Sequence, residues 1–332
     1  MKFLLLLRPV NLLIIALTMY MTKIYIVEAV LTGSFLFENL SDIYQLPENY
    51  ELNFFLLVMM MVLLAAGGNI INDYFDVRAD RINKPKKTYI DYHVSRKTAI
   101  IAHVLFTGAA ILISFYLWFA TGNYQFTLFA LVIALLLWIY SVFLKRKFLI
   151  GNLSIAVLTG IVPYISYLYF LPILSQFENT SLDFTMGNLT FKLVPMYDTI
   201  VFVGIFSALA FLINLVREII KDIYDIIGDR RVGSKTMPIV IGVYATKIIT
   251  SLLILFIVTI FSFPIMMWPQ IVGIKVVFIP FIMMIVLLLI TMFLLIAARE
   301  KDKYKYSSFT LKLTMLYGLF LPMIINSGVN DL

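Results

Sequence analysis

Nine long apolar runs limit what this chain can fold into. They lie at residues 9–32, 52–72, 98–120, 124–144, 149–172, 198–218, 241–267, 274–298 and 308–327. Each is close to or above the roughly 20 apolar residues that a helix needs to cross a bilayer. Because lipid offers exposed backbone groups no hydrogen-bond partners, such runs must be helical. The sequence therefore predicts an all-α, polytopic membrane protein, with nine transmembrane helices in a bundle and one domain over residues 1–332.

The basic residues are distributed unevenly between the connections of these runs. Most of the 26 Lys and Arg residues lie near the N-terminus or in the connections after the second, fourth, sixth and eighth runs. The first connection is acidic instead and holds Glu38, Asp42, Glu48 and Glu51. Because basic connections remain on the cytoplasmic side of a membrane, the N-terminus is predicted to be cytoplasmic. The net charge of +7 therefore reflects membrane topology, and no nucleic-acid partner is predicted.

A polar stripe follows the second apolar run. Asn72, Asp76 and Asp80 recur every four residues, with Asn69 and Asp73 beside them. If the helix continues through this stretch, all five side chains share one face. A carboxylate at the centre of a bilayer costs roughly 2.5–3.5 kcal/mol on insertion scales. Such residues are therefore expected to line a protected cavity and to have a function.

A second polar stripe ends the sixth run. Asp222, Asp225 and Asp229 are spaced three and four residues apart, one turn after Glu218 and two after Asn214. Two facing stripes of this charge would repel each other unless cations lay between them. The chain has no cysteine, and neither of its two histidines has a second one at ligand spacing. Oxygen ligands alone favour Mg²⁺, which proteins often hold together with substrate phosphates. The alternative is ion pairing between the stripes and the surrounding Arg and Lys residues.

Other polar residues lie near the same helix ends. Lys145 follows the fourth run, with Tyr140 on a neighbouring face, and is favoured as a phosphate-contacting residue over a topological anchor. Asn152 opens the fifth run and would either cap that helix or orient a substrate. Arg8 and Asn11 are the polar residues at the start of the first run, where Arg8 has topology as its alternative explanation.

The two stripes resemble the aspartate-rich motifs of UbiA-type intramembrane prenyltransferases, and the nine predicted helices extend the resemblance over essentially the whole chain. The motifs read Asn72-Asp73-x-x-Asp76-x-x-x-Asp80 and Asp222-x-x-Asp225-x-x-Gly228-Asp229. The resemblance implies Mg²⁺-dependent transfer of a polyprenyl group from its diphosphate to an acceptor. The Mg-diphosphate ligands it implies are Asn72, Asp76, Asp80, Asp222, Asp225 and Asp229, with Lys145 on the diphosphate.

The remaining expected site residues bind substrate rather than metal. They are Arg8, Asn11, Asn69, Asp73, Tyr140, Arg217 and Lys221. The catalytic residues expected from the resemblance are Asp76, Asp80, Lys145, Asp225 and Asp229. The implied partners are a polyprenyl diphosphate, a prenyl acceptor and membrane lipids.

Within the family, shorter motifs are similar to those of geranylgeranylglyceryl phosphate geranylgeranyltransferases, which make archaeal-type ether lipids. They are Arg8-Pro9-x-Asn11, Gly68-Asn69, Asn83-x-Pro85, Gly151-Asn152 and Arg217-Glu218-Ile219-Ile220-Lys221-Asp222. The chain departs from the pattern after Pro85, where Lys86-Lys87-Thr88-Tyr89-Ile90 replaces a second proline and a glycine. The similarity implies a geranylgeranyl donor and the plasma membrane of a bacterium or an archaeon. The distribution of basic connections predicts that both stripes, and so the active site, face the cytoplasm.

The acceptor has two candidates. A cluster of basic residues crowds the second stripe, comprising Arg217, Lys221, Arg230, Arg231 and Lys235. Because arginine and lysine clusters favour phosphate groups, we expect geranylgeranylglyceryl phosphate. The alternative is an aromatic acceptor such as 4-hydroxybenzoate, used in quinone biosynthesis.

Two other classes of membrane protein fit the sequence less well. A cation-coupled transporter would carry its carboxylates near the bilayer midplane, on broken helices with repeat symmetry. Here the carboxylates lie at helix ends and no repeat is detected. A CDP-alcohol phosphotransferase would contain an Asp-Gly-x-x-Ala-Arg segment, which this chain lacks.

Overall fold

The fold was analysed in a computed structural model, which describes residues 2–32, 49–85, 88–178, 181–186, 189–267 and 274–330. Within these ranges nine helices are long and apolar enough to cross a membrane. The prediction of an all-α, polytopic membrane protein is therefore confirmed. The acidic residues Glu38, Asp42 and Glu48 of the first connection lie outside the described ranges, as do Lys86 and Lys87.

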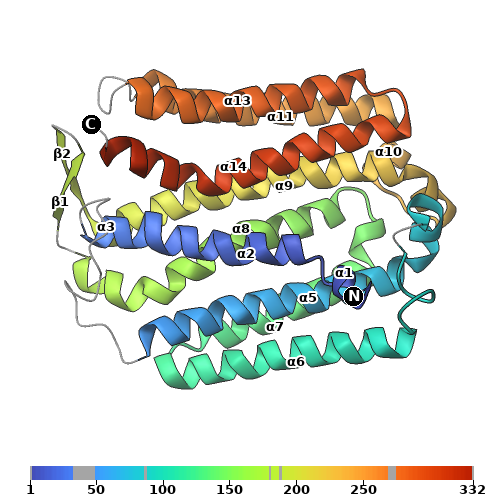
Figure 1. Cartoon of the computed structure of the whole chain (residues 1–332), viewed down its shortest axis with the longest axis horizontal. Coiled ribbons are helices and arrows are strands. Elements are labelled where there is room, and N and C mark those ends of the chain that lie inside the picture. The colour runs from blue at the N-terminus through green and yellow to red at the C-terminus, as the bar shows by residue number, and fades with distance from the viewer. Residues whose placement is uncertain are drawn as a thin grey trace. The chain divides into compact units, whose positions relative to one another are not determined.

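The elements follow one another as labelled in Figure 1. In chain order they are α1 (Lys2–Leu6), α2 (Pro9–Thr22), the π-helical η1 (Lys23–Glu28), α3 (Ala29–Thr32), α5 (Tyr50–Asn83), α6 (Arg96–Thr121), α7 (Gln125–Val142), the 3₁₀ turn η3 (Leu144–Arg146), α8 (Ile150–Leu174), η4 (Ser175–Phe177), β1 (Leu182–Met186), β2 (Leu189–Leu193), α9 (Pro195–Arg231), α10 (Met237–Val240), α11 (Val243–Met267), α13 (Ile274–Ala297), η5 (Lys301–Lys303) and α14 (Tyr304–Asn330).

The chain divides into two compact units, which are described separately. Unit 1 comprises Met1–Leu17, Asn49–Leu158 and Asp222–Thr246. Unit 2 comprises Thr18–Glu48, Thr159–Lys221 and Lys247–Leu332. Both acidic stripes therefore belong to unit 1, apart from Glu218 and Asn214.

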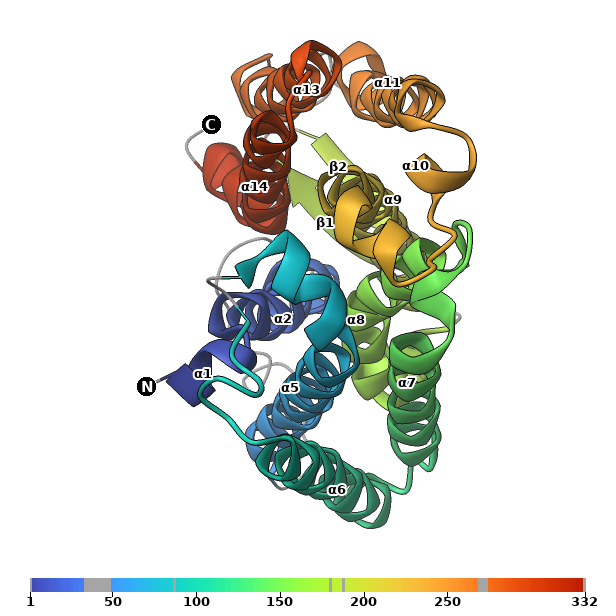
Figure 2. The ribbon, with the colours of Figure 1, turned by 90° about the vertical axis from the view of Figure 1, so that its right-hand side faces the viewer.

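In unit 1, α5 packs against α6 and α7 through two adjacent glycines (Figure 2). A Cβ atom on Gly67 would lie 2.6 Å from Thr107 Oγ1 on α6, and one on Gly68 would lie 2.9 Å from Leu137 Cδ1 on α7. Small residues at membrane helix interfaces allow this close approach, because dispersion contacts replace the hydrophobic driving force there. The glycines thus fix α5 at the centre of unit 1.

A buried apolar cluster fixes the polar end of α5. Leu6 of α1 packs with Ile70 and Val77 of α5 and with Ile90 and Val94 of the turn that follows α5. Ser95 then caps α6 by accepting a hydrogen bond from the Thr98 backbone N–H at 3.0 Å. The turn is therefore held on both sides, which orients the last turns of α5.

Unit 2 contains the long helices α13 and α14, which lie side by side in Figures 1 and 2. A Cβ atom on Gly160 of α8 would lie 3.0 Å from the Ser207 carbonyl oxygen of α9. Close by, Asn214 Nδ2 of α9 donates a hydrogen bond to Thr159 Oγ1 of α8 at 2.8 Å. Glycine and polar pairs therefore join α8 to α9 within unit 2.

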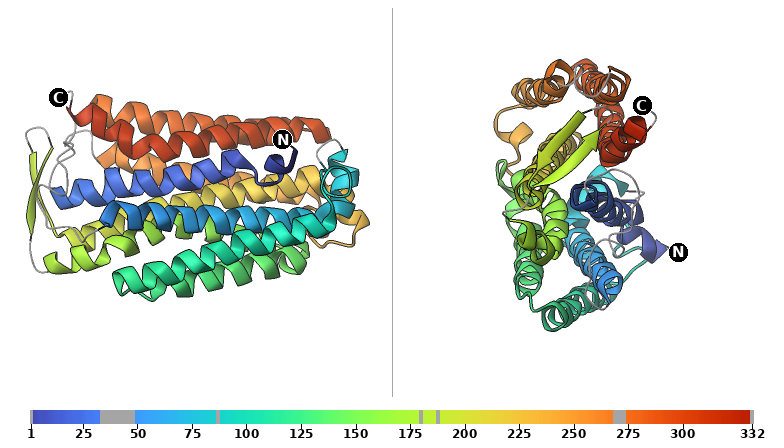
Figure 3. Two further views of the ribbon diagram at one scale, coloured as in Figure 1. Left: turned by 60° about the horizontal axis from the view of Figure 1, so that its bottom comes forward. Right: turned by 90° about the vertical axis from the view of Figure 1, so that its left-hand side faces the viewer.

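Unit 2 also holds an antiparallel hairpin that the sequence did not predict. Strands β1 and β2 pair from Leu182 opposite Leu193 to Met186 opposite Leu189 (Figure 3). The sequence indicated only a polar loop over 173–197. Its short alternating segments are too brief to give a clear strand signal beside nine strong helical ones.

The first apolar run contains a departure from regular α-helix. Residues Lys23–Glu28 form a π-helical segment, in which the buried Lys23 ammonium lies 3.6 Å from the Glu28 carboxylate. These are the two charges that interrupt the run in the sequence. Pairing reduces the cost of holding them inside a membrane-spanning helix.

The outer face of α6 shows how the helices meet lipid. Leu105, Leu112 and Phe119 are 66%, 72% and 81% exposed, and they recur every seven residues. A row of large apolar side chains of this length would be unstable in water. It is consistent with the protein being an integral membrane protein.

Candidate active site

The helix α5 continues without interruption through the first acidic motif. It ends at Asn83, so Asn72, Asp76 and Asp80 lie on successive turns of one helix face. Lys145 Nζ lies 2.7 Å from Asp76 Oδ1 and 3.4 Å from both the carbonyl and the side-chain oxygen of Asn72. Lys145 therefore contacts the first motif directly.

A tight turn places Lys145 beside α5. A Cβ atom on Gly151 would lie 2.7 Å from Lys145 Cα, so only glycine allows η3 to fold back over the start of α8. Leu149 completes the turn with a positive φ of 57°. Tyr140 lies half-buried in the last turn of α7, just before this turn. Burial lowers the pKa of Lys145, and the neighbouring Asp76 carboxylate opposes that shift.

The connection between α1 and α2 meets the other side of the first motif. Arg8 forms an ion pair with Asp73 and adopts a left-handed φ of 55° immediately before Pro9. Residues other than glycine rarely adopt this conformation, and it often marks functional sites. Asn69 Nδ2 donates to the Leu7 carbonyl oxygen at 3.0 Å, and the Asn11 backbone N–H donates to the Arg8 carbonyl oxygen at 2.8 Å. These bonds hold Arg8 over Asp73.

The second acidic motif occupies the last turns of α9, which extends to Arg231. Asn152 Nδ2 donates a hydrogen bond to Asp222 Oδ2 at 2.9 Å. Asn152 is the third residue of α8, so it orients Asp222 rather than capping the helix. Asp225 is buried and its Oδ2 lies 2.5 Å from Lys84 Nζ. Asp229 is half-buried one turn later, and its carbonyl oxygen accepts the Ser234 N–H at 2.9 Å.

Asn83 joins the ends of α5 and α9. Its Nδ2 donates to the Asp225 carbonyl oxygen at 2.7 Å, and its Oδ1 accepts the Gly228 N–H at 2.9 Å. A Cβ atom on Gly228 would lie only 2.4 Å from Asn83 Nδ2 and 2.7 Å from the Ala79 carbonyl oxygen. The glycine of the second motif therefore permits the contact that brings the two acidic motifs together in unit 1.

The carboxylates of the two motifs act on one another electrostatically. Asp80 experiences the negative charges of Asp76, Asp73 and Asp225 as well as the positive charge of Lys84. In the part of the chain that the structure describes, no hydrogen-bonding or ion-pairing group contacts the Asp80 carboxylate. The site thus concentrates negative charge, which two lysines and one arginine offset.

The donors fit a hard divalent cation in their chemistry. They are carboxylate and amide oxygens, the ligand type of Mg²⁺. Asp225 Oδ1 is buried and has no hydrogen-bond partner among the described residues, which is a costly state for a carboxylate oxygen. Within those same residues, no three acidic or histidine side chains lie together as a ready metal site. Asp76 and Asp225 are each paired with a lysine instead, as the ion-pairing alternative anticipated.

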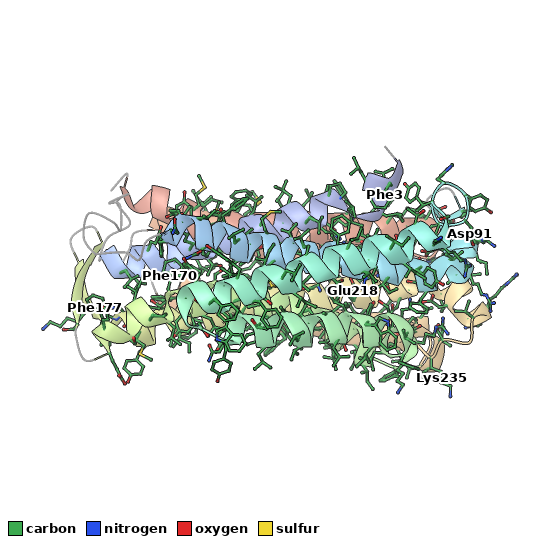
Figure 4. All side chains as sticks on the ribbon, turned by 90° about the horizontal axis from the view of Figure 1, so that it is seen from below. Phe3, Asp91, Phe170, Phe177, Glu218 and Lys235 are labelled. Atoms are coloured by element: carbon green, nitrogen blue, oxygen red, sulfur yellow. The ribbon has the colours of Figure 1, made fainter. Side chains whose placement is uncertain are left out.

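The basic residues expected at the acceptor form a separate network in unit 2. The buried Glu218 carboxylate accepts from Arg217 Nη1 at 2.8 Å and from Lys221 Nζ at 3.0 Å (Figure 4 labels Glu218). Arg217 Nη1 also donates to Asn214 Oδ1 at 3.2 Å. Both cations therefore contact the same buried carboxylate.

Two residues at this site were missed by sequence reasoning. Lys84 was counted only as one of the basic residues after the second run, and Asn83 only as part of Asn83-x-Pro85. Both contact α9 residues more than 140 positions away, which no local pattern reveals. The signal that could have identified them is their position one helical turn after Asp80.

The end of unit 1 beyond these motifs is closed by backbone contacts. The Lys235 N–H donates to the Arg146 carbonyl oxygen at 2.7 Å, which ties the connection after α9 to η3. Asp91, in the turn after α5, lies at the same end of unit 1 as Lys235 (Figure 4). Asp91 accepts hydrogen bonds from Arg81 at 2.9 Å and from Arg96 at 3.0 Å, and the bonds from Arg96 lower its pKa.

Comparison with known proteins gives digeranylgeranylglyceryl phosphate synthases among the relatives. The digeranylgeranylglyceryl phosphate synthase of Thermococcus sibiricus is 34% identical over 180 residues, which cover 54% of this chain and 53% of that protein. The chain thus spans about half the length of the curated relatives it matches.

Solved structures share the fold. One described in terms of digeranylgeranylglyceryl phosphate synthase in membranes has a TM-score of 0.59 and 22% identity, covering 100% of this chain and 98% of that one. A UbiA homologue from Archaeoglobus fulgidus, bound to GPP and Mg²⁺, has a TM-score of 0.54 and 16% identity, covering 97% of this chain and 100% of its own. Finally, the model of the UbiA prenyltransferase family matches residues 43–316, which shows that the chain belongs to that family.

Proposed function

We propose that this protein transfers a geranylgeranyl group from its diphosphate to geranylgeranylglyceryl phosphate, in a reaction that requires Mg²⁺. The observation that carries the proposal is the pairing of a lysine with each acidic motif in unit 1. Lys145 binds Asp76 and Lys84 binds Asp225, so acidic and basic groups alternate where a metal-bound diphosphate would be held. The UbiA homologue bound to GPP and Mg²⁺ supports this ligand class.

The residues that would hold the cation are the oxygen donors of the two motifs. They are Asn72, Asp76, Asp80, Asp222, Asp225 and Asp229. When bound, Mg²⁺ supplies positive charge that stabilises the leaving diphosphate. Asn152 keeps Asp222 oriented for this role through its 2.9 Å hydrogen bond.

The basic residues would then act on the diphosphate itself. Lys145 is buried on a rigid turn and presents a point charge next to the first motif. Arg8, held by its ion pair with Asp73, adds a planar donor on the other side of that motif. Exclusion of water from the site would keep water from capturing the allylic cation before the acceptor hydroxyl does.

The acceptor assignment rests on phosphate recognition in unit 2. Arg217 and Lys221 lie together at the Glu218 carboxylate, at 2.8 and 3.0 Å, and form a pair of adjacent cations. We propose that they bind the phosphate of the glycerol phosphate acceptor. The name of the Thermococcus relative supports this acceptor over 4-hydroxybenzoate.

We further propose one functional domain over residues 1–332, with a cytoplasmic N-terminus and an active site that faces the cytoplasm. The family match over 43–316 crosses both units, which supports a single domain. The distribution of basic connections supports the orientation. The host membrane we propose is the plasma membrane of a bacterium or an archaeon.

Product analysis tests the proposal. Purified protein is incubated with labelled geranylgeranyl diphosphate together with one acceptor. The acceptor is geranylgeranylglyceryl phosphate in one reaction and 4-hydroxybenzoate in another. We expect a labelled ether lipid from the first acceptor only, and none after chelation of divalent cations. Prenylated 4-hydroxybenzoate alone would overturn the acceptor but keep the reaction class. Absence of any transfer product would overturn the enzyme assignment.

A further inference from the structure

Within the proposed site, the contact between Lys84 and Asp225 has a consequence for the binding of metal and donor. Lys84 Nζ lies 2.5 Å from Asp225 Oδ2, and the Lys84 side chain is 27% exposed whereas that of Asp225 is 10% exposed. The ammonium also lies 5.7 Å from the centre of the Tyr224 ring. One oxygen of a central motif carboxylate is therefore occupied by a side chain of the protein.

A lysine in this position competes with a metal ion. An ammonium on one oxygen of a carboxylate repels a divalent cation that approaches the other. The other oxygen, Asp225 Oδ1, is buried and without a hydrogen-bond partner in the described ranges. Asp225 thus has one oxygen available for a cation and a neighbouring charge that weakens its binding there.

We propose that Lys84 occupies Asp225 when substrate is absent and transfers to the donor's diphosphate when the metal-bound donor arrives. Lys84 is then a donor-binding residue that links release of Asp225 to capture of the diphosphate. The inference rests on the proposed function in one respect, that the donor is a prenyl diphosphate. A lysine ammonium is well suited to the exchange, because it binds carboxylate and phosphate oxygens alike as a compact charge.

The backbone around the pair favours movement of Lys84 over movement of Asp225. The Asp225 carbonyl oxygen is held by Asn83 Nδ2 at 2.7 Å, which fixes its turn of α9. Lys84 follows the last residue of α5, with φ −144° and ψ 58°. Its N–H donates to the Asp80 carbonyl oxygen at 2.7 Å, and its carbonyl oxygen accepts from Thr88 Oγ1 at 3.2 Å. Its four-carbon side chain can therefore swing while the main chain stays in place.

The experiment measures two affinities, for a metal ion and for diphosphate, which the proposal predicts to change in opposite directions. Mn²⁺ alone is titrated into the full-length wild type and Lys84→Gln, and inorganic diphosphate is then titrated into each in the presence of saturating Mg²⁺. We expect Lys84→Gln to bind Mn²⁺ about tenfold more tightly and diphosphate about tenfold more weakly, as expected for loss of one charge-assisted hydrogen bond. Lys84→Arg keeps the charge and should keep diphosphate affinity.

Lys97→Gln is the matched control, because Lys97 is an exposed lysine of unit 1 near the start of α6. Both of its affinities should equal those of the wild type. Unchanged or weaker Mn²⁺ binding in Lys84→Gln would overturn the proposal, because removing a lysine with a purely structural role would not increase the affinity for Mn²⁺. If Lys84→Gln does not fold, Lys84→Met, whose side chain is apolar and one atom shorter than that of lysine, is titrated instead with the same two criteria. Wild-type protein that makes no prenylated product would contradict the proposed function, whereas these titrations need no turnover.

Discussion

At the scale of single residues, the site depends on carboxylates whose charge matters more than their shape. Asp76→Asn and Asp225→Asn retain size and hydrogen-bonding capacity but lose the negative charge that pairs with Lys145 and Lys84. We expect each substitution to lower turnover of labelled geranylgeranyl diphosphate by at least about 100-fold, because charge stabilisation in such sites is worth that much. Asp302→Asn, an exposed carboxylate paired with Lys305, is the control.

Near-normal, Mg²⁺-dependent turnover in either motif variant would contradict the metal assignment. Size-exclusion profiles that match the wild type show that lost activity does not come from unfolding.

Arg217 gives a prediction about the acceptor alone. Arg217→Gln removes one of the two cations on Glu218. We expect KM for geranylgeranylglyceryl phosphate to rise by about tenfold, the usual effect of losing a hydrogen bond to a charged group. KM for the donor diphosphate should stay the same. Equal increases in both constants would show that Arg217 acts on the structure or on the donor instead.

The sequence predicted the residues that lie together because of helical spacing. It did not predict the residues that join the site through contacts with distant parts of the chain. Asn72, Asp76 and Asp80 lie on one face because α5 is continuous, as their spacing predicted. Lys84 meets Asp225 across 141 residues of chain, and that distance in sequence hides the contact from any periodicity. The roles of all these residues in catalysis remain predictions.

At the scale of helices, the crossing of α5 and α9 in unit 1 depends on Gly228. Gly228→Ala places a methyl group against Asn83 and the Ala79 carbonyl oxygen, so we expect it to destabilise the protein by about 1–3 kcal/mol. Gly204 on the same helix has nothing within 4 Å of the position that a methyl group would take, so Gly204→Ala should stabilise by about 0.5–1 kcal/mol. Thermal unfolding in detergent measures both. A Tm for Gly228→Ala at or above that of Gly204→Ala would contradict the packing argument.

The turn between α5 and α6 carries a pH-dependent contact. Hydrogen bonds from Arg96 lower the pKa of Asp91 from its ordinary value of 3.8. Because the folded-state pKa is the lower one, the contact stabilises the protein fully above the unfolded value and is lost as pH falls through the folded value. We expect wild type to exceed Asp91→Asn in Tm at about pH 6, with the difference shrinking as the pH falls below 3.8.

Asparagine is a suitable replacement at this position, because Asp91 has a φ of 70° and asparagine tolerates left-handed backbone. A difference in Tm that stays constant with pH would show that the carboxylate's charge is irrelevant to the turn.

The helices themselves could be predicted because lipid imposes length and apolarity on each run. The boundaries could not, because α5 and α9 extend well beyond their apolar segments, to Asn83 and Arg231. Their last turns are polar and are stabilised by tertiary contacts such as that of Asn83 with Gly228. The hairpin β1–β2 lay in a segment where no strong period was visible.

At the scale of the whole molecule, the orientation in the membrane is open to direct measurement. The chain contains no cysteine, so each introduced one is unique. We expect Lys147→Cys and Lys303→Cys to react with a membrane-impermeant thiol reagent only from the cytoplasmic side, since both lie in basic connections. Tyr124→Cys, in the short connection between α6 and α7, should react only from outside. The reverse pattern would remove the argument that the site faces cytoplasmic substrates.

The contacts of Asn83 can form only late in synthesis of the chain. It binds Asp225 and Gly228, which leave the ribosome 142 and 145 residues after it. At about 5–20 residues per second, α5 is therefore in the membrane for on the order of ten seconds before these partners exist. Over that interval Asp73 can already meet Arg8, whereas Asp76 has to wait for Lys145. A chain that stops before Asp222 would lack the α9 residues that Asn83 and Lys84 contact. The polar end of α5 would then distinguish an incomplete chain from a finished one.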